Sequence, residues 1–449
     1  MMAHESLSLL TDLYQLTMAQ AYFNDRKMDR ATFSLFIRSY PLNRGFFISA
    51  GLHDVLKFLE NFAVDGAALD YLSKQQLFTN DFLKFLEKLR FSGDVWALPE
   101  GKLFFKDEPI LEVSAPIIEA QLVETYIINQ INLQSLIATK AARCVLAAGK
   151  RAVVDFALRR THGIDAGMKV ARSSYLAGFV GTSNVLAGKR YAIPTIGTMA
   201  HSFVSSFADE IDAFRSYAAS FPENTTLLID TYDTIAGARK AVEVAKEMAA
   251  RGQRLRGVRI DSGDLAGLAI KVREIFDDAG FSDVKIIGSG GLDEYDLSEL
   301  SAAQIPFHSY GIGTKMGTSS DAPWSDMAYK LVEYGDKPVL KRSPGKISWP
   351  GTKQLFRQRN HQGQLEKDII GLRSERIAGA EPLLRKVMEE GKIVVTLPTL
   401  SESRAGLATE LEHLPDLTKA IRNPLLYPVE LTPALARLLE ETERKLMKS

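Results

Sequence analysis

The order of apolar and polar positions divides the chain into three zones. In the first zone, residues 9–22, 52–62 and 82–89 carry apolar side chains at helical spacing. Short apolar runs broken by proline and glycine follow between residues 93 and 114. The first pattern predicts amphipathic helices and the second is typical of antiparallel strands. We therefore expect a mixed α+β domain over residues 1–120.

A second pattern, short apolar strands alternating with helical segments, fills the middle of the chain. A long helical pattern over residues 119–148, forming one or two helices, precedes it. The predicted strands are residues 153–156, 178–181, 193–197, 226–230, 257–260, 285–287 and 309–312. This alternation indicates parallel strands joined by helices, such as residues 234–251 and 265–279. Because no eighth strand is evident, we predict an α/β fold with an incomplete or distorted barrel over residues 121–320.

The pattern changes again after residue 321. Residues 330–334 and 346–356 are typical of strands, and residues 433–447 are typical of a helix. We expect this C-terminal region, residues 321–449, to pack on the N-terminal domain and to carry no independent chemistry.

Composition excludes several classes of function. The 55 Lys and Arg residues balance 55 Asp and Glu residues, which argues against nucleic acid or a membrane surface as partner. No basic leader or long apolar run is evident, so we expect a cytoplasmic protein. The single cysteine, Cys144, excludes a disulfide framework and a cysteine-based zinc site. Its apolar neighbours predict a packing role.

Polar and glycine residues gather where the predicted parallel strands end. The segments that follow these strands are residues 155–163, 230–233, 259–264, 288–291 and 311–314. Ligands of parallel α/β folds bind beyond the carboxyl ends of the strands. We therefore expect one rim that combines carboxylates, arginines and two glycine loops.

The two glycine loops favour phosphate binding. Ser289, Gly290 and Gly291 precede a predicted helix start, where free backbone N–H groups would face an anion. Gly313 and Thr314 form a second such loop. The alternative is a tight turn that needs glycine for positive φ. Neither a P-loop nor the dinucleotide-binding glycine pattern is present.

Other residues of the rim suit a charged substrate. Arg259 and Asp261 share one strand face, where the arginine suits a substrate carboxylate and the aspartate suits ribose hydroxyls or a Mg²⁺-bound group. Asp264 is better explained as a helix N-cap. A lone histidine is usually structural, but the place of His201 just beyond a predicted strand favours a functional role.

Seven segments, in order, resemble the nicotinate phosphoribosyltransferase family over nearly the whole chain. They are residues 10–18, 156–160, 181–184, 197–202, 258–264, 289–293 and 311–314. The resemblance implies a type II phosphoribosyltransferase that works as a homodimer with shared active sites. It would join nicotinate to 5-phosphoribosyl 1-pyrophosphate, giving nicotinate mononucleotide and pyrophosphate. It would couple this first step from nicotinate towards NAD to ATP hydrolysis and would require Mg²⁺.

The resemblance also implies roles for single residues. Tyr14 of the partner subunit and Phe156 would stack on the pyridine ring, and Thr198 and Arg259 would hold the nicotinate carboxylate. The phosphoribosyl donor would contact Arg159, Asp261, Ser289, Gly290, Gly291, Gly313 and Thr314. His201 corresponds to the histidine that ATP phosphorylates, so His201, Asp261 and Arg259 are the expected catalytic residues. No metal ligand is assigned.

Three alternatives stay open. Ser183 stands where nicotinamide-specific relatives have an aspartate, which favours the acid over the amide. A quinolinate enzyme would need another cation for the second carboxylate, and Arg160 or Lys169 could supply it. A non-catalytic module could bind the donor without turnover, although the presence of both His201 and Asp261 disfavours it.

Overall fold

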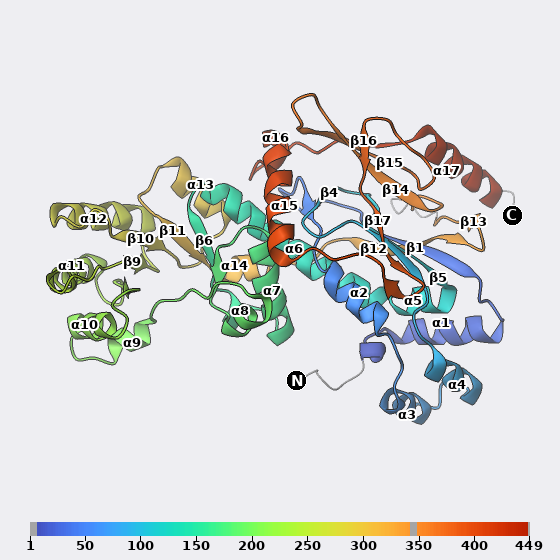
Figure 1. Cartoon of the computed structure of the whole chain (residues 1–449), viewed down its shortest axis with the longest axis horizontal. Helices are drawn as coiled ribbons and strands as arrows, with labels where there is room; N and C mark the ends of the chain where they lie inside the picture. The colour runs from blue at the N-terminus through green and yellow to red at the C-terminus, as the bar shows by residue number, and fades with distance from the viewer. Residues whose placement is uncertain (1–6, 342–347, 448–449) are drawn as a thin grey trace. The chain divides into compact units, whose positions relative to one another are not determined.

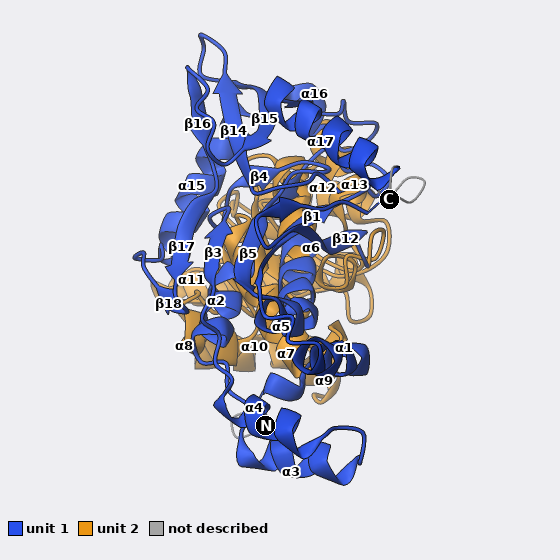
Figure 2. Cartoon of the chain, turned by 90° about the vertical axis from the view of Figure 1, so that its right-hand side faces the viewer, with its two compact units in different colours: residues 1–136, 324–449 blue, residues 137–323 orange. Residues whose placement is uncertain are grey.

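The computed structural model describes residues 7–341 and 348–447 (Figure 1). The chain forms two compact units (Figure 2). Unit 1 comprises residues 1–136 and 324–449, and unit 2 comprises residues 137–323. The predicted domain limits were residues 120 and 320.

Unit 1 is built on a seven-stranded sheet in the order β13-β12-β1-β5-β3-β17-β18. Its strands are β1 Arg30–Ile37, β3 Asp94–Ala97, β5 Leu111–Pro116, β12 Met327–Tyr334, β13 Lys337–Pro338, β17 Arg385–Glu389 and β18 Lys392–Ile393. Neighbouring strands are antiparallel, and β1 from the N-terminal zone lies between β5 and β12. The C-terminal region therefore packs on the N-terminal domain, as predicted.

Two smaller sheets and a set of helices complete unit 1. The sheets combine β16 Ala380–Pro382, β14 Lys353–Arg359, β15 Leu365–Leu372 and β19 Val429–Leu431 in one, and β2 Phe47–Ile48 and β4 Leu103–Phe104 in the other. The helices are η1 Leu7–Leu9, α1 Leu13–Asn24, α2 Leu52–Glu60, α3 Gly66–Lys74, α4 Asn80–Lys88, α5 Ile117–Leu122, α15 Leu400–His413, α16 Asp416–Lys419 and α17 Pro433–Leu446. Helix α6, Glu124–Ala148, runs from unit 1 into unit 2.

Unit 2 is an open parallel sheet in the order β7-β6-β11-β10-β9-β8. Its strands are β6 Ala152–Asp155, β7 Gly181–Thr182, β8 Thr226–Leu228, β9 Gly257–Ile260, β10 Lys285–Gly288 and β11 Ser309–Ile312. The helices are η2 Leu158–Arg160, α7 Ile164–Leu176, α8 Val185–Tyr191, α9 His201–Ser205, α10 Glu210–Ser220, α11 Thr234–Ala250, α12 Leu265–Asp278, α13 Glu294–Ala302 and α14 Thr314–Gly317. This arrangement confirms the predicted incomplete α/β barrel.

One predicted strand of the barrel is wrong. Residues 193–197 form no ladder, and Thr195 makes a single isolated bridge to Thr182. Pro194 has no backbone N–H to donate, and Ala192 before it adopts a left-handed φ of 54°, so the chain cannot extend the pairing. A second strand is shorter than predicted, since β7 covers only Gly181–Thr182.

The boundaries of other predicted elements shift by a few residues. The pattern over residues 119–148 corresponds to two helices, α5 and α6, and the first helix begins at Leu13 after the capping residue Asp12. The strand predicted at 346–356 corresponds to β14, Lys353–Arg359, and residues 346 and 347 lie outside the described residues. Cys144 is buried, in agreement with its predicted packing role.

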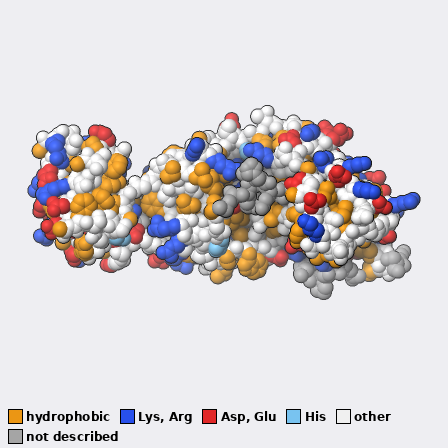
Figure 3. All heavy atoms as spheres, turned by 90° about the horizontal axis from the view of Figure 1, so that it is seen from below, with side chains coloured by type: hydrophobic (Ala, Val, Ile, Leu, Met, Phe, Trp, Pro, Cys, Tyr) orange, Lys and Arg blue, Asp and Glu red, His pale blue; other side chains and the backbone are white. Residues whose placement is uncertain are grey.

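The surface and the helices agree with the balanced charge of the sequence and with its lack of a long apolar run. Basic and acidic side chains lie interspersed on the face shown in Figure 3. Within residues 7–341 and 348–447, no helix has the length and apolar character needed to cross a membrane.

Candidate active site

A cavity of about 410 Å³ lies in unit 2 at the carboxyl ends of the parallel strands. Its lining comes from the segments after β6, β7, β9, β10 and β11 and from the chain before α9. The lining residues are Phe156, Arg159, Arg160, Ser183, Gly197, Thr198, Met199, Ala200, Arg259, Asp261, Ser289, Gly290, Gly291, Gly311, Gly313 and Thr314. All the predicted site residues except Tyr14 and His201 are among them.

Arg259 is the central cation of this cavity. Its Nη1 donates to the Oγ1 of Thr198 at 2.7 Å, and its guanidinium carbon lies 6.0 Å from the centre of the Phe156 ring. The buried Nε has no hydrogen-bond partner within the described chain. Burial lowers the pKa of Arg259, and the nearby carboxylates of Asp261 and Asp230 oppose this shift. The guanidinium stays charged at neutral pH and retains donors for an anion.

Asp261 links the end of β9 to the loop after β10. Its Oδ1 accepts a hydrogen bond from the hydroxyl of Ser289, and its Oδ2 lies 3.9 Å from the Nε2 of His201. Asp261 is therefore an oriented carboxylate with one oxygen directed towards a histidine.

Asp230 fixes the turn that carries Asp261. Its Oδ2 accepts from the backbone N–H of Asp261 at 2.9 Å and from the hydroxyl of Ser262 at 2.7 Å. Its Oδ1 is buried without a hydrogen-bond partner in the part of the chain that the structure describes. The sequence placed Asp230 on the rim but gave it no role. Its position just after β8, beside β9, is the sequence feature that could have indicated this role.

His201 is the first residue of α9 and directly follows the lining segment that ends at Ala200. Its Nδ1 lies 3.1 Å from the Oγ1 of Thr231, and its side chain is 44% exposed. A ring whose Nδ1–H donates to Thr231 has a free lone pair on Nε2, on the side of Asp261. His201 is thus accessible and, in that tautomer, presents Nε2 as its unprotonated nitrogen.

Two glycines allow the backbone approaches that form the cavity. Gly290 has φ +99°, and a Cβ there would lie 1.8 Å from the carbonyl oxygen of Asp261. A Cβ on Gly311 would lie 2.4 Å from the Phe156 ring. The turn explanation therefore holds at Gly290, yet this loop also lines the cavity. At Gly313, φ is −119°, outside the left-handed region.

Asp155 holds the turn that presents Phe156. Its Oδ2 accepts from the hydroxyl of Thr182 at 2.6 Å and its Oδ1 from the backbone N–H of Ala157 at 2.8 Å. Burial raises the pKa of this carboxyl group. This role was not predicted from the sequence, although Asp155 lies at the end of a predicted strand.

The remaining predicted residues have separate places. Asp264 caps α12 by accepting from the backbone N–H of Gly267 at 3.1 Å, as predicted. Arg160 lines the cavity, whereas Lys169 is buried in α7 and is not part of the lining. Tyr14 belongs to α1 in unit 1, is 50% exposed and donates to Glu124 at 3.3 Å.

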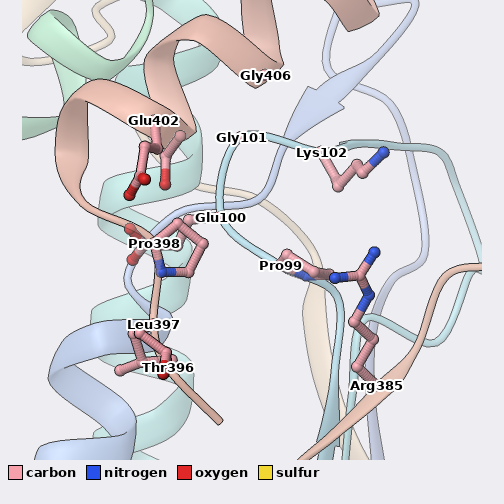
Figure 4. A pocket seen from close by; sticks show the side chains of 11 residues that line it. Pro99, Glu100, Gly101, Lys102, Arg385, Thr396, Leu397, Pro398, Glu402 and Gly406 are labelled. Carbon is pink, nitrogen blue, oxygen red and sulfur yellow. The ribbon is translucent and has the colours of Figure 1, made fainter.

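A second cavity of about 420 Å³ lies in unit 1 (Figure 4). Its charged groups are largely engaged in the fold, since Lys102 pairs with Glu410 at 2.9 Å and Glu100 accepts from the backbone N–H of Gly51 at 2.9 Å. Glu402 caps its own helix by accepting from Thr399. The cavity in unit 2 is therefore the better candidate for chemistry.

Comparisons with known proteins agree over most of the chain. Family profiles match for the nicotinate phosphoribosyltransferase (NAPRTase) N-terminal domain at residues 9–132, the NAPRTase family at 151–335 and the nicotinate phosphoribosyltransferase C-terminal domain at 376–439. Nicotinate phosphoribosyltransferase pncB2 of Mycobacterium tuberculosis is 47% identical over 424 residues, 94% of this chain and 91% of that protein. Nicotinate phosphoribosyltransferase of Bacillus subtilis is 38% identical over 463 residues, 95% of this chain and 93% of that protein.

A solved structure extends the likeness to the fold. The crystal structure of human nicotinic acid phosphoribosyltransferase has a TM-score of 0.87 and 32% identity, and it covers 96% of this chain and 99% of the human chain.

Proposed function

Because the chain belongs to the nicotinate phosphoribosyltransferase family, we propose that it joins nicotinate to 5-phosphoribosyl 1-pyrophosphate. The products are nicotinate mononucleotide and pyrophosphate. The single observation that carries this proposal is the place of Arg259, a cation with spare donors beside an aromatic ring and two glycine loops in one cavity.

The nicotinate subsite is formed by Arg259, Thr198 and Phe156. The hydrogen bond between Thr198 and Arg259 orients the guanidinium, whose remaining donors pair with the carboxylate. Phe156 stacks on the pyridine ring and fixes the nucleophilic nitrogen. Ser183 lines the same cavity and adds no negative charge that would repel the acid.

The donor subsite uses the other residues of the lining. Asp261, oriented by Ser289, accepts hydrogen bonds from the ribose hydroxyls, and Arg159 pairs with phosphate. The loops at Ser289–Gly291 and Gly313–Thr314 hold the phosphates. Displacement at the anomeric carbon develops positive charge on the sugar, which the carboxylate of Asp261 stabilises.

The site also suits Mg²⁺. Within residues 7–341 and 348–447, no cluster of three or more His, Cys, Asp or Glu side chains could hold a metal. Mg²⁺ commonly takes one or two carboxylates and completes its shell with substrate phosphates and water. The unpartnered Oδ1 of Asp230 and the carboxylate of Asp261 would supply these protein ligands. When bound, Mg²⁺ would neutralise the pyrophosphate that leaves the sugar.

ATP coupling in this proposal acts through His201. In the tautomer that carries its proton on Nδ1, close to Thr231, the Nε2 lone pair of His201 attacks the γ-phosphorus of ATP. The bond from that phosphorus to the bridging oxygen breaks, and ADP leaves. Water later hydrolyses the phosphohistidine. This hydrolysis drives the phosphoribosyl transfer to nicotinate, whose own equilibrium is nearly balanced.

The proposed assembly is a homodimer with shared sites. Leu13 and Tyr14 of α1 are 56% and 50% exposed. In unit 2, Ile164 and Val185 at the starts of α7 and α8 are 78% and 73% exposed. We expect these exposed apolar side chains to be buried where the second subunit packs. Tyr14 of one subunit would then complete the nicotinate subsite of the other.

A turnover assay tests the proposed reaction. With nicotinate, 5-phosphoribosyl 1-pyrophosphate, Mg²⁺ and ATP, the purified protein is expected to release pyrophosphate. Nicotinamide and quinolinate are assayed in parallel, because Arg160 could bind the second carboxylate of quinolinate. Release with either of these compounds but not with nicotinate contradicts the substrate assignment. Binding of the donor without release from any compound indicates a non-catalytic module.

Replacement of Arg259 tests recognition of the carboxylate. Arg259→Ala is expected to weaken nicotinate binding by about 2–5 kcal/mol, the range for truncating one partner of a buried charge pair. The measurement is the KM for nicotinate, with Arg239→Ala on the exposed surface of α11 as control. An unchanged KM refutes the assignment.

Replacement of His201 tests ATP coupling. His201→Ala is expected to lose stimulation by ATP and to keep a slow ATP-independent turnover. The rates are measured with and without ATP, and the exposed His361→Ala serves as control. Stimulation that survives in His201→Ala shows that another group carries the coupling.

A mixing experiment tests the shared site. Tyr14→Ala and Arg259→Ala are each expected to be weakly active at low nicotinate. When equal amounts are dissociated and reassembled, random pairing gives mixed dimers with one intact site, so about a quarter of wild-type activity should return. No recovery, or a monomer in sedimentation equilibrium, contradicts the shared dimer.

A further inference from the structure

The two glycine loops of the donor subsite need a fixed spacing. They follow β10 and β11, which pair in parallel with Ile287 opposite Ser309. Each loop leads into its own helix, α13 or α14. A ligand that contacts both loops requires the starts of these helices to keep their relative positions.

Lys315 connects the two helix starts. It lies in α14, two residues after Gly313, and its Nζ is 3.2 Å from the Oδ2 of Asp293 and 3.1 Å from the Oδ2 of Asp296. Asp293 caps α13, and Asp296 accepts from the backbone N–H of Asp293 at 2.9 Å. Burial opposes the charge of Lys315, but these hydrogen bonds prevail and raise its pKa. Lys315 is therefore a charged bridge from the second loop to the first.

Helix α13 has a second anchor that does not involve Lys315. Glu294 is fully buried, with the Nε of Arg143 at 3.0 Å and the Nζ of Lys140 also in contact. The Lys315 bridge, in contrast, is half exposed, since 40% of the lysine side chain is accessible. Loss of Lys315 should therefore release the loop before α14 without unfolding α13.

We propose that Lys315 is a positioning residue for the phosphates of the phosphoribosyl donor. Through its contacts with Asp293 and Asp296, it holds Gly313 and Thr314 in register with the loop at Ser289–Gly291. The proposal rests on the proposed function, because it takes the donor as the ligand of both loops.

Calorimetry and kinetics on the full chain test this role. Lys315→Ala is expected to raise the dissociation constant for 5-phosphoribosyl 1-pyrophosphate with Mg²⁺ about ten-fold, as for one lost charge-assisted link. The KM for the donor should rise similarly, while the KM for nicotinate and the melting temperature stay near wild type. Lys315→Arg should restore donor binding. Lys271→Ala, an exposed lysine of α12, is the matched control.

Asp296→Asn separates positioning from direct contact with phosphate. If Lys315 positions the loops through Asp296, this change weakens donor binding as Lys315→Ala does, and the double variant is no weaker than either single one. If Lys315 contacts phosphate directly, freeing it from Asp296 leaves donor binding unchanged or stronger. The second result overturns the proposal.

Donor binding by the wild-type protein distinguishes failure of the proposed function from failure of the role of Lys315. A wild-type protein that does not bind the donor overturns both the proposed function and the role of Lys315. A wild-type protein that binds the donor, together with Lys315→Ala that binds it equally well, overturns the role of Lys315 alone.

Discussion

The geometry of the site depends on a partly buried guanidinium, that of Arg259. Its hydrogen-bond donors are not all paired within the described chain. Arg259 sits at the end of β9, bonds Thr198 with one nitrogen and keeps a buried Nε without a partner in the described chain. A charge held out of water is costly unless an opposite charge compensates it. The sheet positions Asp261 and Asp230 near enough to oppose the pKa shift of Arg259. A substrate carboxylate in the cavity would complete this compensation.

Buried or oriented carboxylates hold the loops around this cation. Asp155 ties the turn with Phe156 to Thr182, and Asp230 ties the turn with Asp261 to the end of β8. Gly290 lets its loop approach Asp261 at a distance that no side chain would allow. All these contacts join residues of unit 2, so the cavity forms within that unit. The family comparison and the parallel sheet together give the type II phosphoribosyltransferase fold.

The sequence predicted the rim well because parallel strands bring their carboxyl ends to one edge whatever the lengths of the helices between them. Arg259, Asp261 and Ser289 were therefore assigned to one site from strand positions alone. The supporting contacts of Asp155, Asp230 and Lys315 join residues from different strands or helices, so spacing along the chain does not reveal them. The false strand at residues 193–197 arose because apolar residues suggested a ladder that Pro194 cannot continue. The place of Tyr14 next to the nicotinate ring still rests on the family resemblance.

The most direct test of the central claim is a crystal structure of the protein with nicotinate and the donor bound. The account predicts that the nicotinate carboxylate pairs with Arg259 and Thr198, that the ring lies on Phe156, and that the phosphates occupy the two glycine loops. Ligands bound elsewhere, or a nicotinate carboxylate turned away from Arg259, would contradict it.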